Sequence, residues 1–250
     1  MSGLAIDIKN VSVRYHEKTV LKSITTSVPT GAICGLVGMN GAGKSTLFKA
    51  IMDAVPISRG TVHLGGKTVK TAQKEGLVAY VPQTEAIDWN FPVSVEDVVM
   101  MGRYGFMNIM RTPSDKDRAA VDEALRRVHL GDFATRQIGQ LSGGQRKRVF
   151  VGRALAQGAS ILLLDEPFAG VDAKTEASLV TLLRELQTQG VTTLIAAHDL
   201  NTIGLYCDHI ILLNQTIIAS GPTKKVFTEE NISKTYDSVF GQKGAVPWTF

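Results

Sequence analysis

The chain has 250 residues, of which 44% are hydrophobic and 20% charged, and this composition excludes a disordered chain and predicts a globular protein with a substantial core. The net charge of +4 comes from scattered short basic groups, so we expect no nucleic-acid partner. Two cysteines far apart in the sequence and five histidines without metal-ligand spacing predict reduced thiols and no transition-metal site.

The N-terminal part is predicted to hold two kinds of strand. Residues 5–15 and 20–28 alternate polar and apolar side chains, which predicts an antiparallel β region rather than an exported leader. Residues 32–37 are almost continuously apolar, as in a strand buried on both faces, and glycines connect them to a helix that starts near Lys44. We therefore expect an α/β core from residue 32 onward.

A helical insertion is predicted in the middle of the chain. Apolar residues recur at helical spacing over residues 114–130, and Ser114 and Asp117 have the spacing of a capping box at the start of this helix. The surrounding segment is rich in helical patterns, so we assign a helical subdomain to residues 91–157 of a single domain that covers residues 1–240.

The C-terminal half is predicted to complete a parallel sheet. Residues 161–164 and 192–197 are apolar runs joined by a helix with leucines on one face, as in a βαβ unit. Residues 210–213 and 217–219 predict a hairpin, and the tail over residues 241–250 has no clear element. These runs are far shorter than the roughly 20 residues of a membrane helix, so any membrane role would need a partner.

A phosphate-binding loop is the first functional motif. Residues 38–45 fit the pattern G-x-x-x-x-G-K-S between a buried strand and a helix, where glycines let backbone N–H groups surround phosphate oxygens and the helix N-terminus favours an anion. The lysine adds a positive charge for the phosphates and the serine hydroxyl suits Mg²⁺. The candidate nucleotide-binding residues are Gly38, Asn40, Gly41, Gly43, Lys44, Ser45 and Thr46.

Two carboxylates follow the strand at residues 161–164. Asp165 is placed to hold Mg²⁺, and Glu166 is placed to polarise an attacking water, which predicts a nucleotide hydrolase rather than a passive binder. Taken alone, the pair also fits a strand end and a helix cap.

The sequence Leu-Ser-Gly-Gly-Gln at residues 141–145 resembles the ABC ATPase signature, and it follows the phosphate loop and precedes the two carboxylates in the order of that family. Ser142 and Gln145 also have the spacing of a capping box, and both interpretations can hold. The resemblance implies an ABC-type P-loop NTPase fold and a homodimer in which Ser142, Gly144 and Gln145 of one copy close over ATP held by the other.

Four further positions match the family pattern. Tyr15 resembles the aromatic residue that stacks on adenine, and edge-strand packing is its alternative role. Gln83 matches the Q-loop, Asp172 matches the D-loop despite altered neighbouring residues, and His198 matches the switch histidine.

The resemblance also implies how hydrolysis proceeds. Lys44, backbone donors and the opposing Ser142 would stabilise charge on the phosphates, while Glu166 and His198 position water. ATP would bridge the two copies, and its hydrolysis would let the dimer open. The Mg²⁺ that accompanies ATP would be held by Ser45, Gln83 and Asp165.

The cargo is predicted from resemblance alone. Asp88, Trp89 and the Met-Gly-Arg-Tyr sequence at residues 101–104 are similar to ATPases of bacterial manganese, zinc and iron importers, with manganese placed first. The resemblance implies a peripheral subunit at the cytoplasmic face of the cell membrane, bound to integral permease subunits and acting indirectly with an extracytoplasmic metal-binding protein.

A nucleotide-dependent adaptor without turnover is one alternative, and the presence of Glu166 and His198 counts against it. Two alternatives that keep the chain an ATPase stay open. One is an importer ATPase for chelated iron, haem or cobalamin, which shares every nucleotide motif. The other is a soluble ABC protein without a transport role. The single ATPase unit and the lack of a long heptad tract in the sequence count against it.

Overall fold

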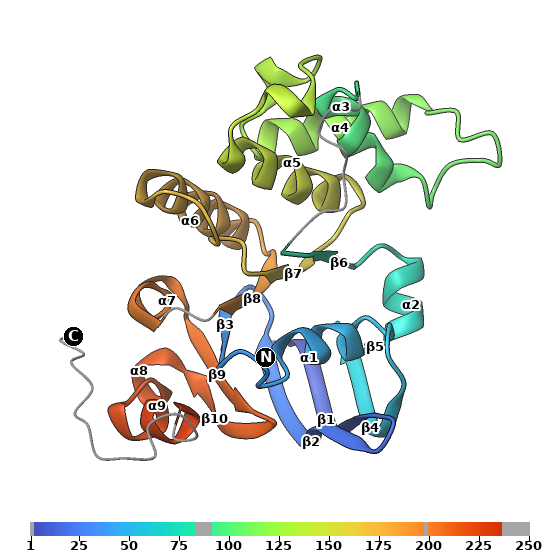
Figure 1. The fold of residues 1–250 in the computed structure, drawn as a ribbon. Helices are drawn as coiled ribbons and strands as arrows, with labels where there is room; N and C mark the ends of the chain where they lie inside the picture. Colours follow the sequence, from blue (N-terminus) through green and yellow to red (C-terminus); the bar gives the residue numbers. More distant parts are fainter. Residues whose placement is uncertain (1–2, 84–91, 198–199, 237–250) are drawn as a thin grey trace.

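The N-terminal part forms an antiparallel sheet, as predicted from its alternating residues. The computed structural model describes residues 3–83, 92–197 and 200–236. Four strands pair in the order β2-β1-β4-β5 (Figure 1). Their bounds are Leu4–Tyr15 for β1, Lys18–Pro29 for β2, Ile57–Leu64 for β4 and Lys67–Thr68 for β5.

The central sheet has the order β10-β9-β3-β8-β7-β6, and all neighbouring pairs are parallel except the terminal hairpin of β9 and β10. Every residue of β3, β7 and β8 is buried, which explains their continuous apolar runs. Helix α6 (Ala173–Thr188) joins β7 to the parallel neighbour β8, so the predicted βαβ unit and hairpin are confirmed. The strand bounds are Ile33–Val37 for β3, Val78–Val81 for β6, Ile161–Asp165 for β7, Thr192–Ala197 for β8, His209–Asn214 for β9 and Thr216–Pro222 for β10.

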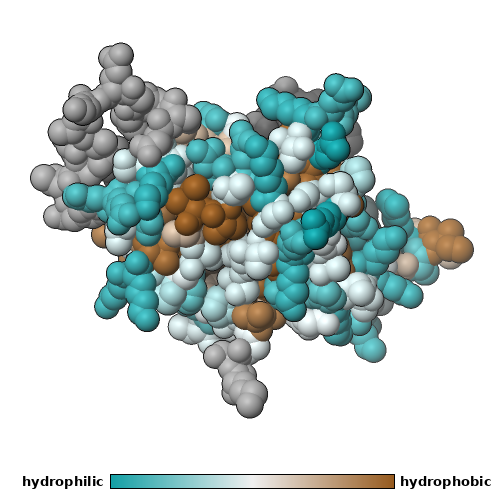
Figure 2. Space-filling view, turned by 90° about the horizontal axis from the view of Figure 1, so that it is seen from below, coloured by the Kyte–Doolittle hydropathy of each residue, from teal (hydrophilic) through white to brown (hydrophobic). Residues whose placement is uncertain are grey.

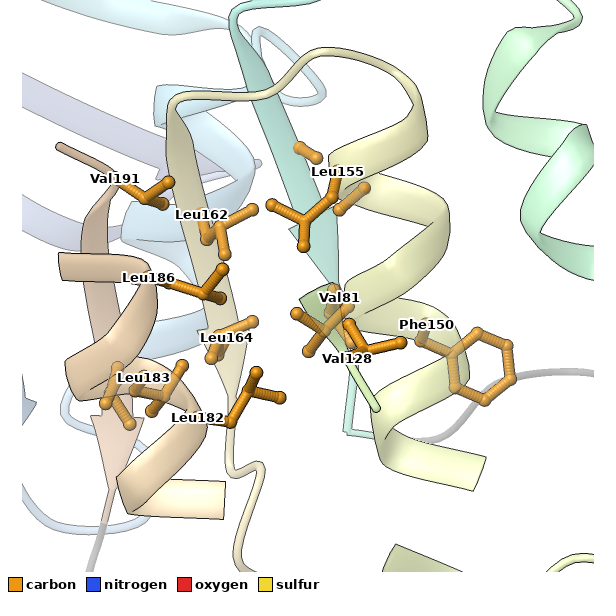
Figure 3. Close-up of a cluster of buried hydrophobic side chains, with 14 of the residues drawn as sticks. Val81, Val128, Phe150, Leu155, Leu162, Leu164, Leu182, Leu183, Leu186 and Val191 are labelled. Carbon is orange, nitrogen blue, oxygen red and sulfur yellow. The ribbon is translucent and has the colours of Figure 1, made fainter. Parts of the chain in front are cut away.

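The central sheet separates two hydrophobic cores. One core packs β1, β2 and helix α1 (Lys44–Ile51) against one face, and the other packs helices of the middle segment and α6 against the opposite face. Figure 3 shows Leu162 and Leu164 of β7 between the leucines of α6 and Leu155 of the middle segment. Leu163 of β7 is buried in the other core, on the opposite face of the sheet. Each buried leucine is worth about 1.5–3 kcal/mol, so β7 is fixed from both faces. The strand that ends in Asp165 is therefore a rigid support.

The middle segment is helical and lies together at the top of Figure 1. Its helices are α3 (Val95–Met100), the 3₁₀ turn η1 (Met101–Arg103), α4 (Asp115–Arg127), the 3₁₀ turns η2 (Gly131–Phe133) and η3 (Ile138–Gln140), and α5 (Gly143–Ala156). The helix predicted over residues 114–130 is α4, with the predicted capping box of Ser114 and Asp117. It ends earlier than predicted because Val128 has left the helical backbone, and residues 131–133 form η2 instead.

The remaining helices are short. They are α2 (Val69–Lys74), α7 (Leu200–Tyr206), α8 (Thr223–Val226) and α9 (Glu229–Tyr236). In the described parts of the chain, no helix is both long and apolar enough to span a bilayer. The tail predicted over residues 241–250 lies outside the described residues.

Candidate nucleotide site

The loop between β3 and α1 is shaped by its glycines. A Cβ on Gly38 would lie 2.2 Å from the carbonyl oxygen of Leu213, and a Cβ on Gly43 would lie 2.6 Å from the side chain of Leu21. Gly43 also has φ 104°, in the left-handed region that favours glycine. No side chain caps the N-terminus of α1, so its first N–H groups are left for a ligand. This is the geometry of an anion site.

Lys44 is folded back into this loop. Its side chain is buried, and Nζ donates to the carbonyl oxygens of Gly38 at 2.6 Å and Met39 at 3.2 Å. Burial lowers the pKa of the Lys44 ammonium, while the negative charges of Glu166 and Asp165 oppose that shift. An ammonium whose acceptors among the described residues are neutral carbonyls is poised to exchange them for phosphate oxygens, which are stronger acceptors.

Three other candidate residues of the loop are open to solvent. Asn40, Gly41 and Ser45 are exposed, and Thr46 is half-buried. The Ser45 hydroxyl is thus accessible for a hard cation that accompanies the phosphates.

The two carboxylates stand at the end of β7. Asp165 is buried, and it accepts a hydrogen bond of 3.0 Å from the Tyr80 hydroxyl, which no sequence pattern had indicated. Glu166 has φ 47°, a strained conformation for a residue with a side chain, and its N–H donates to the carbonyl oxygen of Ala196 on β8. Because β3, β7 and β8 are parallel, their carboxyl ends bring the phosphate loop and both carboxylates to one edge of the sheet.

Gln83 joins this group from the end of β6. Its Nε2 donates to Oε2 of Glu166 at 2.8 Å, and its main-chain oxygen accepts a hydrogen bond of 3.4 Å from Nζ of Lys147 on α5. The structure thus brings Gln83 into direct contact with one of the two carboxylates, and its role as a Mg²⁺ ligand stays a prediction. The structure also gives Lys147 a place beside the site that the sequence did not predict.

The signature residues form the first turn of α5. Ser142 is the N-cap: its Oγ accepts from the N–H of Gln145, and the Gln145 Oε1 accepts from the N–H of Ser142 at 3.0 Å. The predicted capping box is confirmed. Gly144 lies against α6, where an added Cβ would stand 2.3 Å from Cγ2 of Thr175. A glycine is therefore required at this position for packing.

Asp172 has a structural role that the sequence interpretation missed. Its carboxylate is the N-cap of α6 and accepts hydrogen bonds from the N–H of Thr175 at 2.9 Å and from its hydroxyl at 3.0 Å. These hydrogen bonds lower the pKa of Asp172. The spacing Asp-x-x-Thr before a leucine-faced helix was the available signal. Thr175 thus contacts both the D-loop and the signature helix.

The Met-Gly-Arg-Tyr segment anchors the helical part of the chain. A Cβ on Gly102 would lie 2.2 Å from the carbonyl oxygen of Arg153 on α5. Arg103 pairs with Asp117 of α4 at 2.9 Å and donates to the carbonyl oxygen of Ala156. The structure thus gives a packing role to residues that the sequence linked only to a family resemblance, whereas Asp88 and Trp89 lie outside the described residues.

Two further predicted site residues are Tyr15 and His198. Tyr15 is partly exposed at the end of β1, where it pairs with Lys18. His198 lies outside the described residues. The nucleotide roles of both residues stay predictions.

Comparison with known proteins gives the family. The model of the ABC transporter family matches residues 21–169, more than half of the chain. The chain belongs to the ABC transporter family. It is 54% identical to the manganese transport system ATP-binding protein MntA of Synechocystis, with 94% of this chain and 91% of that protein covered. It is 52% identical to the chelated iron transport system membrane protein YfeB of Yersinia pestis, with 93% of this chain and 79% of that protein covered.

A solved structure has the same fold. The ATP-binding cassette of an ABC transporter in its ADP conformation matches with a TM-score of 0.84 at 25% identity, and the match covers 94% of this chain and 99% of that one. The predicted fold class is thus confirmed, and the chain is an ABC ATPase. The phosphate loop, the signature and both carboxylates fall within the family match, whereas Tyr15, Asp172 and His198 lie outside it.

Proposed function

We propose that this chain is the ATP-hydrolysing subunit of an importer for divalent transition-metal ions. The observation that carries the proposal is the convergence of Lys44, Asp165, Glu166 and Gln83 at one sheet edge of an ABC transporter family member. The relatives named for manganese and chelated iron transport support the cargo class. We place manganese first, then zinc or iron.

The described residues divide the work of phosphoryl transfer. The uncapped start of α1 and Lys44 offer donors to the phosphates, where charge develops. Glu166 accepts the proton of the attacking water, and Gln83, which bonds to Glu166, orients that carboxylate. We assign His198 to the same step from the motif order. When bound, Mg²⁺ would neutralise phosphate charge, with Ser45, Asp165 and Gln83 as its protein ligands.

The second half of the site comes from another copy of the chain. Ser142 and Gly144 lie at the start of α5, where the side chains of Ser142 and Gln145 each accept a hydrogen bond from the backbone N–H of the other residue. This capping box holds the first turn in place, and we assign the anion-binding role to the N–H groups that remain at this helix start. In a homodimer this helix start closes over ATP held by the partner, and phosphate release lets the dimer open. Integral permease subunits at the cytoplasmic face of the membrane convert that motion into transport, and an extracytoplasmic metal-binding protein supplies the ion.

Metal accumulation in cells tests this function. The chain is expressed with its candidate permease and metal-binding protein in cells that lack their own importer, and manganese, zinc and iron are measured by elemental mass spectrometry. Glu166→Gln removes the base, and Glu230→Gln, an exposed glutamate of α9 paired with Lys234, is the matched control.

We expect one metal to rise with the wild type and with Glu230→Gln, and not with Glu166→Gln. If no metal rises although the complex hydrolyses ATP, metal import is wrong, and chelated iron, haem or cobalamin becomes the cargo to test. If ATP hydrolysis needs no permease and no cargo moves, a non-transport ABC protein is indicated. Unchanged turnover in Glu166→Gln would refute its role as the base.

A further inference from the structure

Exposed apolar side chains are concentrated in one loop of the helical part. Among the described residues, five of the eight large apolar side chains that are exposed lie between Met101 and Met110. Ile109 is 101% exposed and Met110 is 83% exposed, so neighbouring residues barely screen either side chain. The loop over residues 101–111, called here the apolar loop, protrudes from the body in Figure 1 and forms an isolated brown point at the edge of Figure 2.

The tip of the apolar loop is an ordered turn with apolar residues. The N–H of Arg111 donates to the carbonyl oxygen of Asn108 at 2.9 Å, which closes a β-turn with Ile109 and Met110 at its two central positions. Neither Ile109 nor Met110 has a positive φ, and a turn of this kind accepts most residue types at its central positions, so the turn does not require apolar side chains. Local backbone chemistry therefore does not explain the two apolar residues. Their exposure is an added feature that calls for a partner.

The base of the loop is braced by arginines stacked on aromatic rings. The Arg111 guanidinium lies 5.0 Å from the ring centre of Tyr104, and the Arg103 guanidinium lies 4.5 Å from that of Phe106. Arg103 is neutralised by Asp117, whereas no ion pair in the described parts of the chain involves Arg111. The sequence carries no carboxylate from residue 98 to residue 114. The loop thus has an apolar tip, aromatic side chains behind it and an uncompensated positive charge.

We propose that the apolar loop inserts its tip into the headgroup region of an anionic bilayer. This arrangement matches a membrane interface, where apolar side chains enter the acyl boundary, aromatic rings sit at headgroup level and basic side chains meet anionic lipid. A protein partner fits less well, because a stable interface buries roughly 800 Å² on each side and a protruding turn offers no such face. Two apolar residues bind a bilayer weakly by themselves, so this lipid contact adds to the binding of the chain to the permease.

The inference rests on the proposed function, which brings the chain to a membrane. It extends that function by giving the ATPase its own lipid contact, fixed through Arg103 and Gly102 to the helical part that carries the signature.

Fluorescence labelling of the full-length chain tests the contact. Cys34 and Cys207 are buried, so Ile109→Cys introduces an accessible thiol for an environment-sensitive fluorophore. Leu205→Cys on α7 is the matched control, because Leu205 is a large apolar residue that is likewise highly exposed, at 83%. The probes are phosphatidylcholine vesicles with and without phosphatidylglycerol. We expect a blue-shifted, brighter emission at position 109 with the anionic vesicles and no change at position 205.

Vesicle flotation of unlabelled protein gives the second readout. The double variant Ile109→Ser with Met110→Ser should lower the partition coefficient on anionic vesicles at least about tenfold, because most of the inserted apolar surface is lost, while Leu205→Ser should leave it unchanged. Arg111→Gln should lower it about fivefold and only on anionic vesicles.

Three outcomes would overturn the proposal. They are no response of the label at position 109, equal flotation of wild type and double variant, or a double variant that floats normally and fails to assemble with the permease, which would make the permease the partner. In each case metal uptake and its loss in Glu166→Gln still test the proposed function independently.

Discussion

The contact between the signature helix and α6 gives a sharp test of the packing. Gly144→Ala would place a Cβ 2.3 Å from Cγ2 of Thr175, a β-branched side chain that has little freedom in a helix. Gly143→Ala is the matched control, because nothing lies within 4 Å of its Cβ. Both changes gain the same helix propensity at the start of α5, so the difference between them isolates the collision.

The expected magnitude follows from overpacking. Forcing an extra methyl into a packed contact costs about 1–3 kcal/mol, so Gly144→Ala should be less stable than Gly143→Ala by that amount. In a chain of this size the difference corresponds to a fall of about 2–12 °C in melting temperature. Thr175→Ser removes Cγ2 and keeps the hydroxyl that donates to Asp172, so the double variant with Gly144→Ala should recover most of the loss.

Thermal unfolding of the purified chain, followed by circular dichroism, measures all four variants. The cycle of Gly144→Ala and Thr175→Ser should show a coupling energy of about 1 kcal/mol or more. Equal stability of the two alanine variants would refute the contact. Additive effects of the two changes would show that the cost of Gly144→Ala does not come from Thr175.

Three other predictions concern the site and its support. Lys44→Met should abolish phosphate release. It should not lower the melting temperature, because methionine replaces the buried ammonium with a side chain that needs no hydrogen-bond acceptors, and a large fall in stability would contradict this. Gln83→Ala should lower phosphate release about tenfold to hundredfold and retain ATP binding, measured with a fluorescent analogue, because the donor to Glu166 is lost; equal losses of both would refute this positioning role. Asp117→Asn should be less stable than wild type at neutral pH. Hydrogen bonds from Ser114 hold the pKa of Asp117 at about 2, below its ordinary 3.8, so the stabilisation from the ionised carboxylate is present above pH 3.8 and is lost as the pH falls through 2. Urea unfolding of both proteins across this range should show that the difference in their free energies of unfolding decreases as the pH falls. A difference that stays constant would contradict the prediction.

Motifs of short range were predictable from the sequence. The phosphate loop, the signature and the capping box of Ser114 each depend on residues within one turn or loop, so spacing alone is sufficient to find them. The parallel sheet was predictable because a strand buried on both faces needs an apolar run. The N-cap of α6 by Asp172 depends on residues just as close in the sequence. It could have been predicted, but Asp172 was assigned only from the family pattern.

Contacts of long range were not predictable from the sequence. The hydrogen bond from Tyr80 to Asp165 joins residues 85 positions apart, and it exists because β6 pairs with β7 in a register that places Tyr80 beside Leu163. The approach of Gly144 to Thr175 depends in the same way on how α5 packs on α6. From the sequence, a glycine at the start of a helix can be explained by a turn, a cap or close packing. The side chain that lies next to it in the structure shows which explanation holds.

The start of α1 differs from the starts of helices α2 to α6 in how its N–H groups are satisfied. Helices α3, α4 and α5 carry capping boxes, and side chains of Thr68 and Asp172 cap α2 and α6. Helix α1 has no side-chain cap, its N-cap is the glycine Gly43 in a left-handed conformation, and Lys44 beside it bonds only to carbonyl oxygens. The N–H groups at a helix start without a cap lack acceptors, and a bound phosphate would accept their hydrogen bonds and so stabilise the helix. Phosphate binding would therefore stabilise the start of α1, whereas the first turn of α5 is held by its own capping box.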